Sequence, residues 1–358
     1  MPQAKAAPTP SLTPGTPEVA AQLERLHVEI KRVVVGQDRI VERLLVALMS
    51  RGHCLLEGVP GLAKTLAAET LARAAGGTFT RLQFTPDLIP SDIVGTRIYR
   101  PSSETFDVEL GPVFANFVLA DEINRAPAKV QSALLEVMSE RHVSIGGVTY
   151  PAPDPFLVLA TQNPIESEGV YPLPEAQRDR FLLKVLVPYP TPTEELEIIN
   201  RMGVDPPSAR AVLEAHDLKL LQDAADRVFV NQGIAEYAVR LVLTTRDPGA
   251  FGLTDLAPIL DYGASPRASL GLVAAARALA LLRGREYALP EDLTDVARDV
   301  LRHRLVLSFE AVADGVDVED VITRILDSVA PPSIAPLQIQ DPSSFTPRDE
   351  EPPPVTDA

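Results

Sequence analysis

The sequence predicts an α/β fold, in which a central, mostly parallel sheet is followed by a smaller, all-helical domain. Short apolar runs alternate with helical patterns over residues 18–187. Such alternation is typical of a parallel sheet that helices cover on both faces. From residue 193 onward the strand signals fade, and helical patterns continue to residue 330. We therefore expect two domains, 18–187 and 193–330.

Each element follows from a local pattern. Strands are expected at residues 53–57, 79–84, 116–121, 156–161 and 182–187, with helices among them at 38–50, 64–75 and 127–140. Prolines stiffen a linker at 188–192. The second domain is expected to contain helices at 193–202, 216–229, 232–245, 266–283, 291–303 and 318–329. The end segments, 1–17 and 331–358, are rich in proline and offer little to bury, so we expect both to be disordered.

Residues 142–150 alternate apolar and polar side chains around the pair Gly146-Gly147. Such a pair predicts a hairpin with a two-residue turn. We expect its four apolar side chains to be split between two faces, so that the hairpin projects from the sheet and contributes little to stability. It is either a plain surface hairpin or a loop that contacts a partner.

Composition bears on compartment and partners. The formal net charge is −16, and a chain of this charge repels nucleic acid at long range. No apolar run reaches the length of a membrane span, and the start of the sequence lacks the basic-then-apolar order of a signal peptide. The single cysteine, Cys54, excludes an internal disulfide and fits a reducing compartment. We expect a cytoplasmic protein without membrane insertion, for which nucleic acid is a disfavoured partner.

The most informative segment joins the first strand to the following helix. It consists of Gly58, Val59, Pro60, Gly61, Leu62, Ala63, Lys64 and Thr65, and Leu66 comes next. Backbone N–H groups of such a loop point at phosphate oxygens at a helix N-terminus. Lys64 would add a charge at the β- and γ-phosphates, and the Thr65 hydroxyl would take one Mg²⁺ position.

One residue departs from the general pattern of this loop. Ala63 stands where the pattern has glycine. A left-handed backbone would penalise the Cβ of alanine. We therefore expect Ala63 to adopt nearly helical backbone angles.

Candidate metal-binding and catalytic groups follow two later strands. Asp121 and Glu122 come directly after the apolar run 117–120. Asp121 would hold Mg²⁺ through water, and Glu122 would orient and polarise the attacking water. Asn163 follows the next apolar strand, and its amide could hydrogen-bond the γ-phosphate or the water.

Three arginines complete the candidates. Arg178 and Arg180 lie before the last strand, where an adjacent subunit could present its nucleotide and an arginine could neutralise transition-state charge. The alternative is a solvated salt-bridge cluster. Arg267 follows Ser265 and Pro266, which fit the cap and first turn of a helix in the second domain. From there Arg267 could report the state of the nucleotide to that domain.

In this order along the chain, the motifs resemble those of the MoxR family of AAA+ ATPases. The resemblance spans residues 30–310, with motifs at 58–65, 120–126, 160–164, 173–181 and 263–268. It implies an AAA+ module with a helical lid, and the family commonly carries alanine at the position of Ala63. The roles that it implies are the first nucleotide motif for Lys64 and Thr65, the second for Asp121 and Glu122, the first sensor for Asn163, the arginine finger for Arg180 and the second sensor for Arg267.

The resemblance also implies cofactors and partners. Val35, Gly36 and Gln37 resemble the segment near the adenine, and residues 97–110 match an insertion. The role of Arg178 stays open, because family members usually have an apolar residue there. Members are thought to act as chaperone-like ATPases. This implies ATP and Mg²⁺ as cofactors, a homo-oligomeric ring of six copies, and a protein client or a von Willebrand factor A domain partner.

Three other functions share part of this pattern. A guanine-nucleotide switch would need an Asn-Lys-x-Asp motif, which the sequence lacks. A DNA-associated motor is disfavoured by the acidic net charge, and binding of single-stranded DNA at low salt would reveal it. A nucleotide-dependent scaffold without turnover is disfavoured by Asp121, Glu122 and Arg180, and a turnover assay would detect it.

Overall fold

The computed structural model describes residues 12–164 and 169–333. Its centre is a sheet with the strand order β2-β5-β8-β1-β9, in which every pairing is parallel. The strands are β1 (Cys54–Glu57), β2 (Phe79–Gln83), β5 (Phe117–Asp121), β8 (Leu157–Gln162) and β9 (Leu183–Leu186). The predicted parallel sheet is confirmed, and each strand lies within a residue or two of its expected position.

Both faces of this sheet are buried. Successive residues of a strand point to opposite faces, and neighbours in sequence accordingly belong to different core clusters. Leu56 and Leu119 pack in one cluster, whereas Leu55 and Val118 pack in the other. This burial on both sides explains why the strands are continuous apolar runs.

The first half contains helices at the three predicted places, two short unpredicted helices, α4 and α6, and one long unpredicted helix, α1. Its helices are α1 (Pro17–Val33), α2 (Asp38–Met49), α3 (Lys64–Ala74), α4 (Pro90–Val94), α5 (Ala128–Glu140) and α6 (Glu175–Arg178). The long unpredicted helix, α1, buries Leu23, Leu26 and Ile30 at helical spacing. This face packs against the same core cluster as α2 and α3.

The ordered structure begins before residue 18. Leu12 is only 7% exposed, and its carbonyl accepts a hydrogen bond from Arg227. The Thr16 side chain caps α1 by accepting a hydrogen bond from the Val19 N–H. The expectation of disorder is therefore wrong for residues 12–17. The expected disorder of residues 1–11 and 334–358 falls outside the described residues.

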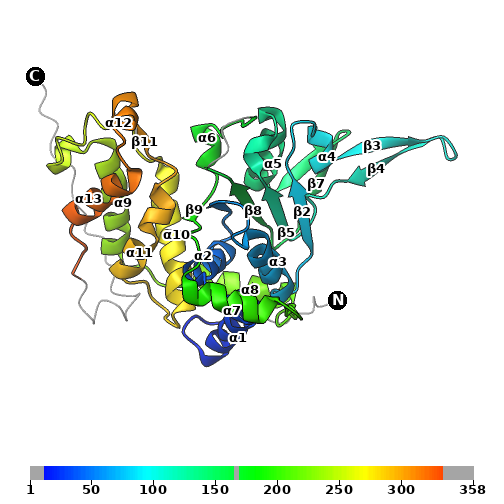
Figure 1. Ribbon diagram of the computed structural model, residues 1–358, viewed down its shortest axis with the longest axis horizontal. Helices are drawn as coiled ribbons and strands as arrows, with labels where there is room; N and C mark the ends of the chain where they lie inside the picture. Colours follow the sequence, from blue (N-terminus) through cyan, green and yellow to red (C-terminus); the bar gives the residue numbers. More distant parts are fainter. Residues whose placement is uncertain (1–11, 165–168, 334–358) are drawn as a thin grey trace, which may run out of the picture.

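Two hairpins extend from the first half. β3 (Gly95–Arg100) and β4 (Thr105–Leu110) pair antiparallel and form an arm that reaches away from the body of the molecule (Figure 1). β6 (His142–Ile145) and β7 (Val148–Pro151) form the second hairpin. Gly146 and Gly147 make its two-residue turn, with φ of +59° and +85°. The predicted hairpin is confirmed, and both turn positions need a residue that accepts positive φ.

The prediction about the faces of this second hairpin is wrong. Val143 pairs with Tyr150 and Ile145 with Val148, so all four apolar side chains share one face. Val143 and Ile145 are 8% and 6% exposed and pack into the core beneath the sheet. The hairpin is therefore a packed element, which contradicts the expectation that it contributes little to stability.

The second half is mostly helical. Its helices are α7 (Pro192–Met202), α8 (Ala215–Asp226), α9 (Gln232–Arg246), α10 (Pro266–Leu282), α11 (Pro290–Leu301), α12 (Phe309–Ala313) and α13 (Val318–Ser328). The six predicted helices are present. The half is not all-helical, however, because β10 (Leu260–Tyr262) and β11 (Val306–Leu307) form a small antiparallel sheet. These strands are too short for the alternation of side chains to predict them.

The two halves share one hydrophobic core. Leu44 of α2, Leu241 of α9 and Leu279 of α10 belong to the same buried cluster. An ion pair joins the halves within this core, since Arg43 Nε lies 2.7 Å from Asp299 Oδ2 and both side chains are 1% exposed. The linker at 188–192 therefore does not separate the halves in space. In the part of the chain that the structure describes, no helix is both long and apolar enough to span a bilayer.

Candidate active site

The glycine-bearing loop connects β1 to the N-terminus of α3. It packs closely against Val187, which directly follows β9, a neighbour of β1 in the sheet. A Cβ on Gly58 would lie 2.8 Å from Val187 Cβ, so only glycine fits this approach. Gly61 has φ +84° and open space around its α-carbon. The loop thus presents its backbone at the carboxyl edge of the sheet, where a helix N-terminus favours an anion.

The expectation for Ala63 is wrong. Its backbone has φ +55° and ψ +21°, which is the left-handed region. That conformation costs an L-residue other than glycine about 1–2 kcal/mol. The loop therefore holds Ala63 in a strained conformation, as is common at ligand-binding sites.

The loop forms one side of a pocket of about 410 Å³ that collects most of the predicted site residues. Its lining consists of Pro60, Gly61, Leu62, Ala63, Lys64, Thr65, Leu66, Arg81, Asp121, Glu122, Thr161, Gln162 and Asn163. Parallel strands bring these residues together, because the carboxyl ends of β1, β5 and β8 meet at one edge of the sheet.

Lys64 lies partly buried on the floor of this pocket. Its Nζ donates hydrogen bonds to the carbonyl oxygens of Gly58 and Val59. Burial lowers the pKa of Lys64 below its usual value, although the carboxylates of Asp121 and Glu122 act in the opposite direction. The ammonium group is already partly desolvated, so a phosphate that enters the pocket meets a charge with part of its water already removed.

Both oxygens of Asp121 accept hydrogen bonds from the protein. Oδ1 accepts from Thr161 Oγ1 at 2.6 Å, and Oδ2 accepts from Arg81 Nη2 at 2.6 Å and Nε at 3.0 Å. The Thr161 hydroxyl also accepts from the backbone N–H of Glu122 at 2.8 Å. One threonine on β8 therefore fixes the positions of both acidic residues.

Glu122 also has a strained backbone, with φ +55°. Its Oε2 lies 2.9 Å from Gln83 Nε2, which donates a hydrogen bond, and 3.1 Å from Arg125 Nε. A non-glycine residue in the left-handed region that lines a pocket is a candidate for function. Here the strain turns the side chain at the end of β5 toward the pocket.

The sequence did not predict Arg81, Gln83 and Thr161 as functional residues. Arg81 and Gln83 lie on the same face of β2, two residues apart, and Gln83 is the register partner of Asp121. Thr161 is 1% exposed and precedes Asn163 in the same strand and its exit. Each could have been found only with the strand order in hand, because their importance comes from lying beside Asp121.

The donor set fits Mg²⁺. The Thr65 hydroxyl and the Asp121 carboxylate offer hard oxygen ligands, which this ion prefers. Among residues 12–164 and 169–333 there is no group of three or more His, Cys, Asp or Glu that could hold a metal ion. Mg²⁺ that is bound through one or two side chains and the phosphates of a substrate needs no such group.

The predicted adenine segment lies at the same edge of the sheet but outside the pocket lining. Gln37 Nε2 donates to the Pro188 carbonyl at 3.2 Å. A Cβ on Gly36 would meet the Glu194 carboxylate, so this glycine lets α7 approach closely. Val35 is buried beside them. The segment thus contacts Pro188 at the start of the linker. The residue before it, Val187, adjoins the glycine-bearing loop.

Arg180 and Arg267 do not line the pocket around Lys64. Arg180 Nη1 donates to the Leu135 carbonyl at 2.5 Å, and the side chain borders a separate cavity of about 480 Å³ beside α5. Arg267 is exposed near the start of α10. Arg178 pairs with Glu175 at 3.3 Å on α6. Within one chain, therefore, the two implied arginines stand apart from the predicted phosphate site.

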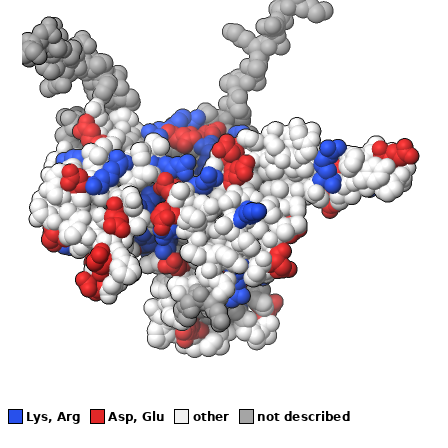
Figure 2. All heavy atoms as spheres, turned by 90° about the horizontal axis from the view of Figure 1, so that it is seen from above, with Lys and Arg blue, Asp and Glu red and all other residues white. Residues whose placement is uncertain are grey.

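Positively charged side chains cluster on one face of this acidic protein. Figure 2 views the molecule from above, onto the side of α6 and α12, and Lys and Arg side chains gather near the middle of this face. Such a surface can attract an anionic group in spite of the net charge of −16.

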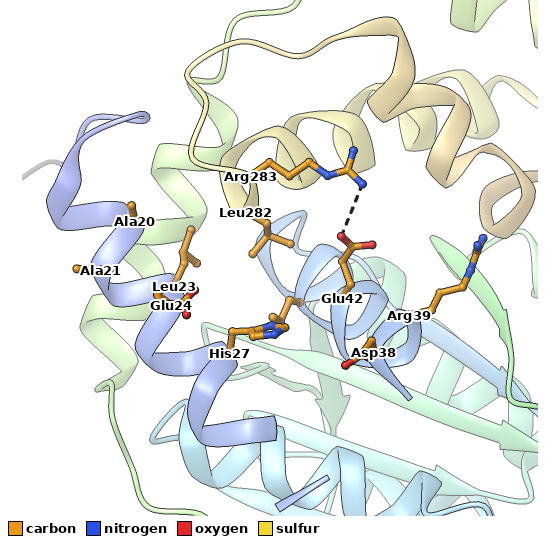
Figure 3. A pocket seen from close by; sticks show the side chains of 11 residues that line it. Ala20, Ala21, Leu23, Glu24, His27, Asp38, Arg39, Glu42, Leu282 and Arg283 are labelled. Carbon is orange, nitrogen blue, oxygen red and sulfur yellow. Dashed lines mark ion pairs between the residues drawn. The ribbon is translucent and has the colours of Figure 1, made fainter. Parts of the chain in front are cut away.

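A third, larger cavity of about 710 Å³ shares no lining residue with the pocket around Lys64. It opens between α1, α2 and the C-terminal end of α10, where Arg283 pairs with Glu42 across it at 3.7 Å (Figure 3). His27 of α1 and Arg39 of α2 also line it. No predicted site residue lines this cavity, so its size alone does not make it the active site.

Comparison with known proteins agrees with the fold. Residues 53–183 match the sequence model of the ATPase family associated with various cellular activities, AAA, and residues 253–325 match the AAA lid domain. A crystal structure of a protein from Cytophaga hutchinsonii superposes with a TM-score of 0.84 at 45% identity, covering 88% of this chain and 96% of that one.

Curated relatives are similar over almost their whole length. Chaperone MoxR1 of Mycobacterium tuberculosis is 62% identical over 92% of this chain and 88% of its own. Protein MoxR of Methylorubrum extorquens is 32% identical over 88% of this chain and 96% of its own. A solved structure, that of an MCM homolog from Methanopyrus kandleri, is 17% identical at a TM-score of 0.55, covering 84% of this chain and 64% of that one, and shares the fold alone. This chain belongs to the MoxR family of AAA+ ATPases.

Proposed function

We propose that this chain binds and hydrolyses ATP with Mg²⁺, and that it does so in a homo-oligomeric ring that remodels a protein partner. The observation that carries the proposal is the single pocket that brings Lys64, Thr65, Asp121, Glu122 and Asn163 together. The combination of a loop at a helix N-terminus, a lysine and two acidic residues is what phosphoryl transfer to water requires.

Each residue has a role in this proposal. Lys64 and the backbone of the loop bind the triphosphate, while Thr65 and Asp121 hold the metal ion. Mg²⁺, when bound, neutralises charge on the phosphates. Glu122 polarises the attacking water, and Asn163 orients the water or the γ-phosphate. Val35–Gln37 contact the adenine.

A ring of six copies would complete the site. Because Arg180 and Arg267 stand outside the pocket of their own chain, we propose that Arg180 reaches the nucleotide of a neighbouring copy. Arg267 then reports the nucleotide state to the lid. The M. tuberculosis relative is named a chaperone, which supports a protein client, or a partner with a von Willebrand factor A domain, in the cytoplasm.

Two variants test the proposal. Lys64→Ala removes the fixed charge at the triphosphate, so nucleotide binding should be lost. Glu122→Gln should keep binding and lose about 100-fold or more in turnover, because it removes only the group that polarises water. Lys129→Ala, which removes an exposed lysine from α5, is the control and should alter neither. Equal loss of binding in the first two variants would contradict the assigned roles.

The same variants test the remodelling role. Glu122→Gln protein held in ATP should retain a bound partner, and Lys64→Ala protein should not. A partner that is recovered equally with both would argue that association does not depend on nucleotide.

A further inference from the structure

Arg81 is a cation that already pairs with Asp121, the predicted metal ligand. Two of its nitrogens, Nε and Nη2, donate to the same oxygen of Asp121, at 3.0 Å and 2.6 Å. The side chain lines the pocket that contains Lys64 and Thr65. Nη2 also donates to Gln83 Oε1 at 3.0 Å, and this contact keeps the guanidinium turned toward Asp121.

The Asp121 carboxylate needs a positive partner in every state of the site. Its side chain is 12% exposed, and a carboxylate with so little water around it is costly unless a charge or hydrogen bonds compensate it. Thr161 supplies a neutral hydrogen bond to Oδ1. Oδ2, which faces Arg81, is therefore the oxygen at which a second cation would have to compete.

The two ends of this ion pair differ in freedom. Asp121 is fixed by β5 and by Thr161, whereas the Arg81 side chain is 50% exposed on the edge strand β2. A long, half-exposed arginine can move its head group into solvent at little cost, while its charge is always present. Movement of Arg81, rather than of Asp121, would thus open the oxygen.

We propose that Arg81 is a positioning residue that pairs with Asp121 in the nucleotide-free site and is exchanged for the metal ion when metal and nucleotide bind. This inference rests on the proposed function. The exchange replaces one cation with another, so Asp121 stays compensated throughout. It also sets the metal concentration that the site requires, because Mg²⁺ must displace a bound guanidinium.

The test is the dependence of nucleotide affinity on Mg²⁺. Binding of a fluorescent ATP analogue is followed by anisotropy while free Mg²⁺ is titrated from an EDTA-buffered zero. The Mg²⁺ midpoint is the free Mg²⁺ concentration that gives half of the Mg²⁺-dependent increase in nucleotide binding. In Arg81→Ala this midpoint should fall by about 5-fold or more, since the competing charge is gone. The Mg²⁺ midpoint of Arg81→Lys should lie between those of Arg81→Ala and the original chain, because lysine keeps the charge but cannot donate through two nitrogens as the guanidinium does.

Arg73→Ala is the matched control. Arg73 is 53% exposed and pairs with a carboxylate, Glu69, at 2.6 Å, on a helix that carries the loop. Its loss should leave the Mg²⁺ midpoint unchanged. If Arg81→Ala unfolds below the assay temperature, Arg81→Gln, which keeps hydrogen-bonding groups without charge, takes its place.

The outcomes separate two failures. An unchanged or higher Mg²⁺ midpoint in Arg81→Ala, while the original chain shows Mg²⁺-dependent binding, overturns the exchange and leaves the proposed function standing. A fall in the Mg²⁺ midpoint of Arg73→Ala as large as that of Arg81→Ala would also overturn it, since loss of any nearby positive charge would then produce the same change. If the original chain binds no nucleotide at any Mg²⁺ concentration, the proposed function fails as well.

Discussion

The Asp179 carboxylate binds the buried guanidinium of Arg304, with Oδ1 2.8 Å from Nε. Asp179 immediately precedes Arg180, and Arg304 follows the end of α11. Asp179 Oδ2 also accepts from the Ser265 hydroxyl at 2.8 Å, and Ser265 caps the helix that begins with Pro266 and Arg267. The loop of one implied arginine is thereby joined to the helix of the other.

Loss of this ion pair should be costly. Arg304 is 7% exposed, so Asp179→Ala leaves a buried charge without its carboxylate and should reduce the free energy of unfolding by about 3–5 kcal/mol. Equilibrium unfolding in urea measures this. Glu175→Ala is the control, since Glu175 is 66% exposed and pairs with Arg178 on the surface; it should cost at most about 1 kcal/mol. Similar losses in the two variants would contradict the distinction.

A buried histidine makes stability depend on pH. Burial, helped by the nearby charge of Arg141, lowers the pKa of His53 to about 3. The neutral ring fits its partners, because Nδ1 accepts from the Val158 N–H at 3.0 Å and Nε2 donates to the Met138 carbonyl at 3.2 Å. In the unfolded chain the pKa of a histidine is about 6.5.

The sign of the effect follows from proton binding. Below about pH 6.5 the unfolded chain binds a proton at His53 that the folded protein refuses, so stability is complete above this pH and falls as the pH is lowered toward 3. His53 alone should contribute a slope of about 1.4 kcal/mol per pH unit. Urea unfolding at several pH values between 7 and 5 measures the slope, and His53→Gln should reduce it. An unchanged slope in that variant would argue against a neutral buried His53.

The strands and the phosphate loop were predictable because their signals are local. An apolar run such as 117–120, or a glycine-bearing loop that ends in Lys64 and Thr65, carries its meaning within a few residues. Arg81 is different. A charged residue in an edge strand is typical of a solvated face, and only the pairing of β2 with β5 reveals Asp121 beside it.

Other errors have physical causes that can be named. At Ala63, the geometry of the loop overrides the preference of alanine for negative φ. In the hairpin, residues 143 and 145 are two apart and so point to the same face of their strand. A two-residue turn pairs them with residues 150 and 148, which point to that face too. The shared face was therefore already implied by the sequence. What the sequence could not give is that this face meets the core.

The packed hairpin should contribute to stability through Ile145. Ile145 is 6% exposed, and Ile145→Ala should cost about 2–4 kcal/mol, because it removes buried methyl groups and leaves a cavity. Its cross-strand partner Val148 is 53% exposed, so Val148→Ala should change stability by at most about 0.5 kcal/mol. Thermal and urea unfolding compare the two. If both variants match the original chain, the hairpin is the unpacked loop that its sequence predicts.

Glycine substitutions test the strain at Ala63. Ala63→Gly relieves the left-handed conformation, and this gain offsets the greater freedom of glycine in the unfolded chain, so stability should change little or rise. Ala67→Gly, in the buried interior of α3, should cost about 1 kcal/mol or more. Equal losses in urea unfolding would show that the loop does not strain residue 63.

The most direct test of the central claim, that neighbouring copies complete the nucleotide site, is ATP turnover in mixed assemblies. Arg180→Ala should bind ATP normally and hydrolyse it poorly, because Arg180 lies outside the pocket of its own chain. Mixed with Glu122→Gln under conditions of subunit exchange, it should recover turnover, since one variant supplies Arg180 and the other supplies Glu122. No recovery at any mixing ratio would contradict a site shared between copies.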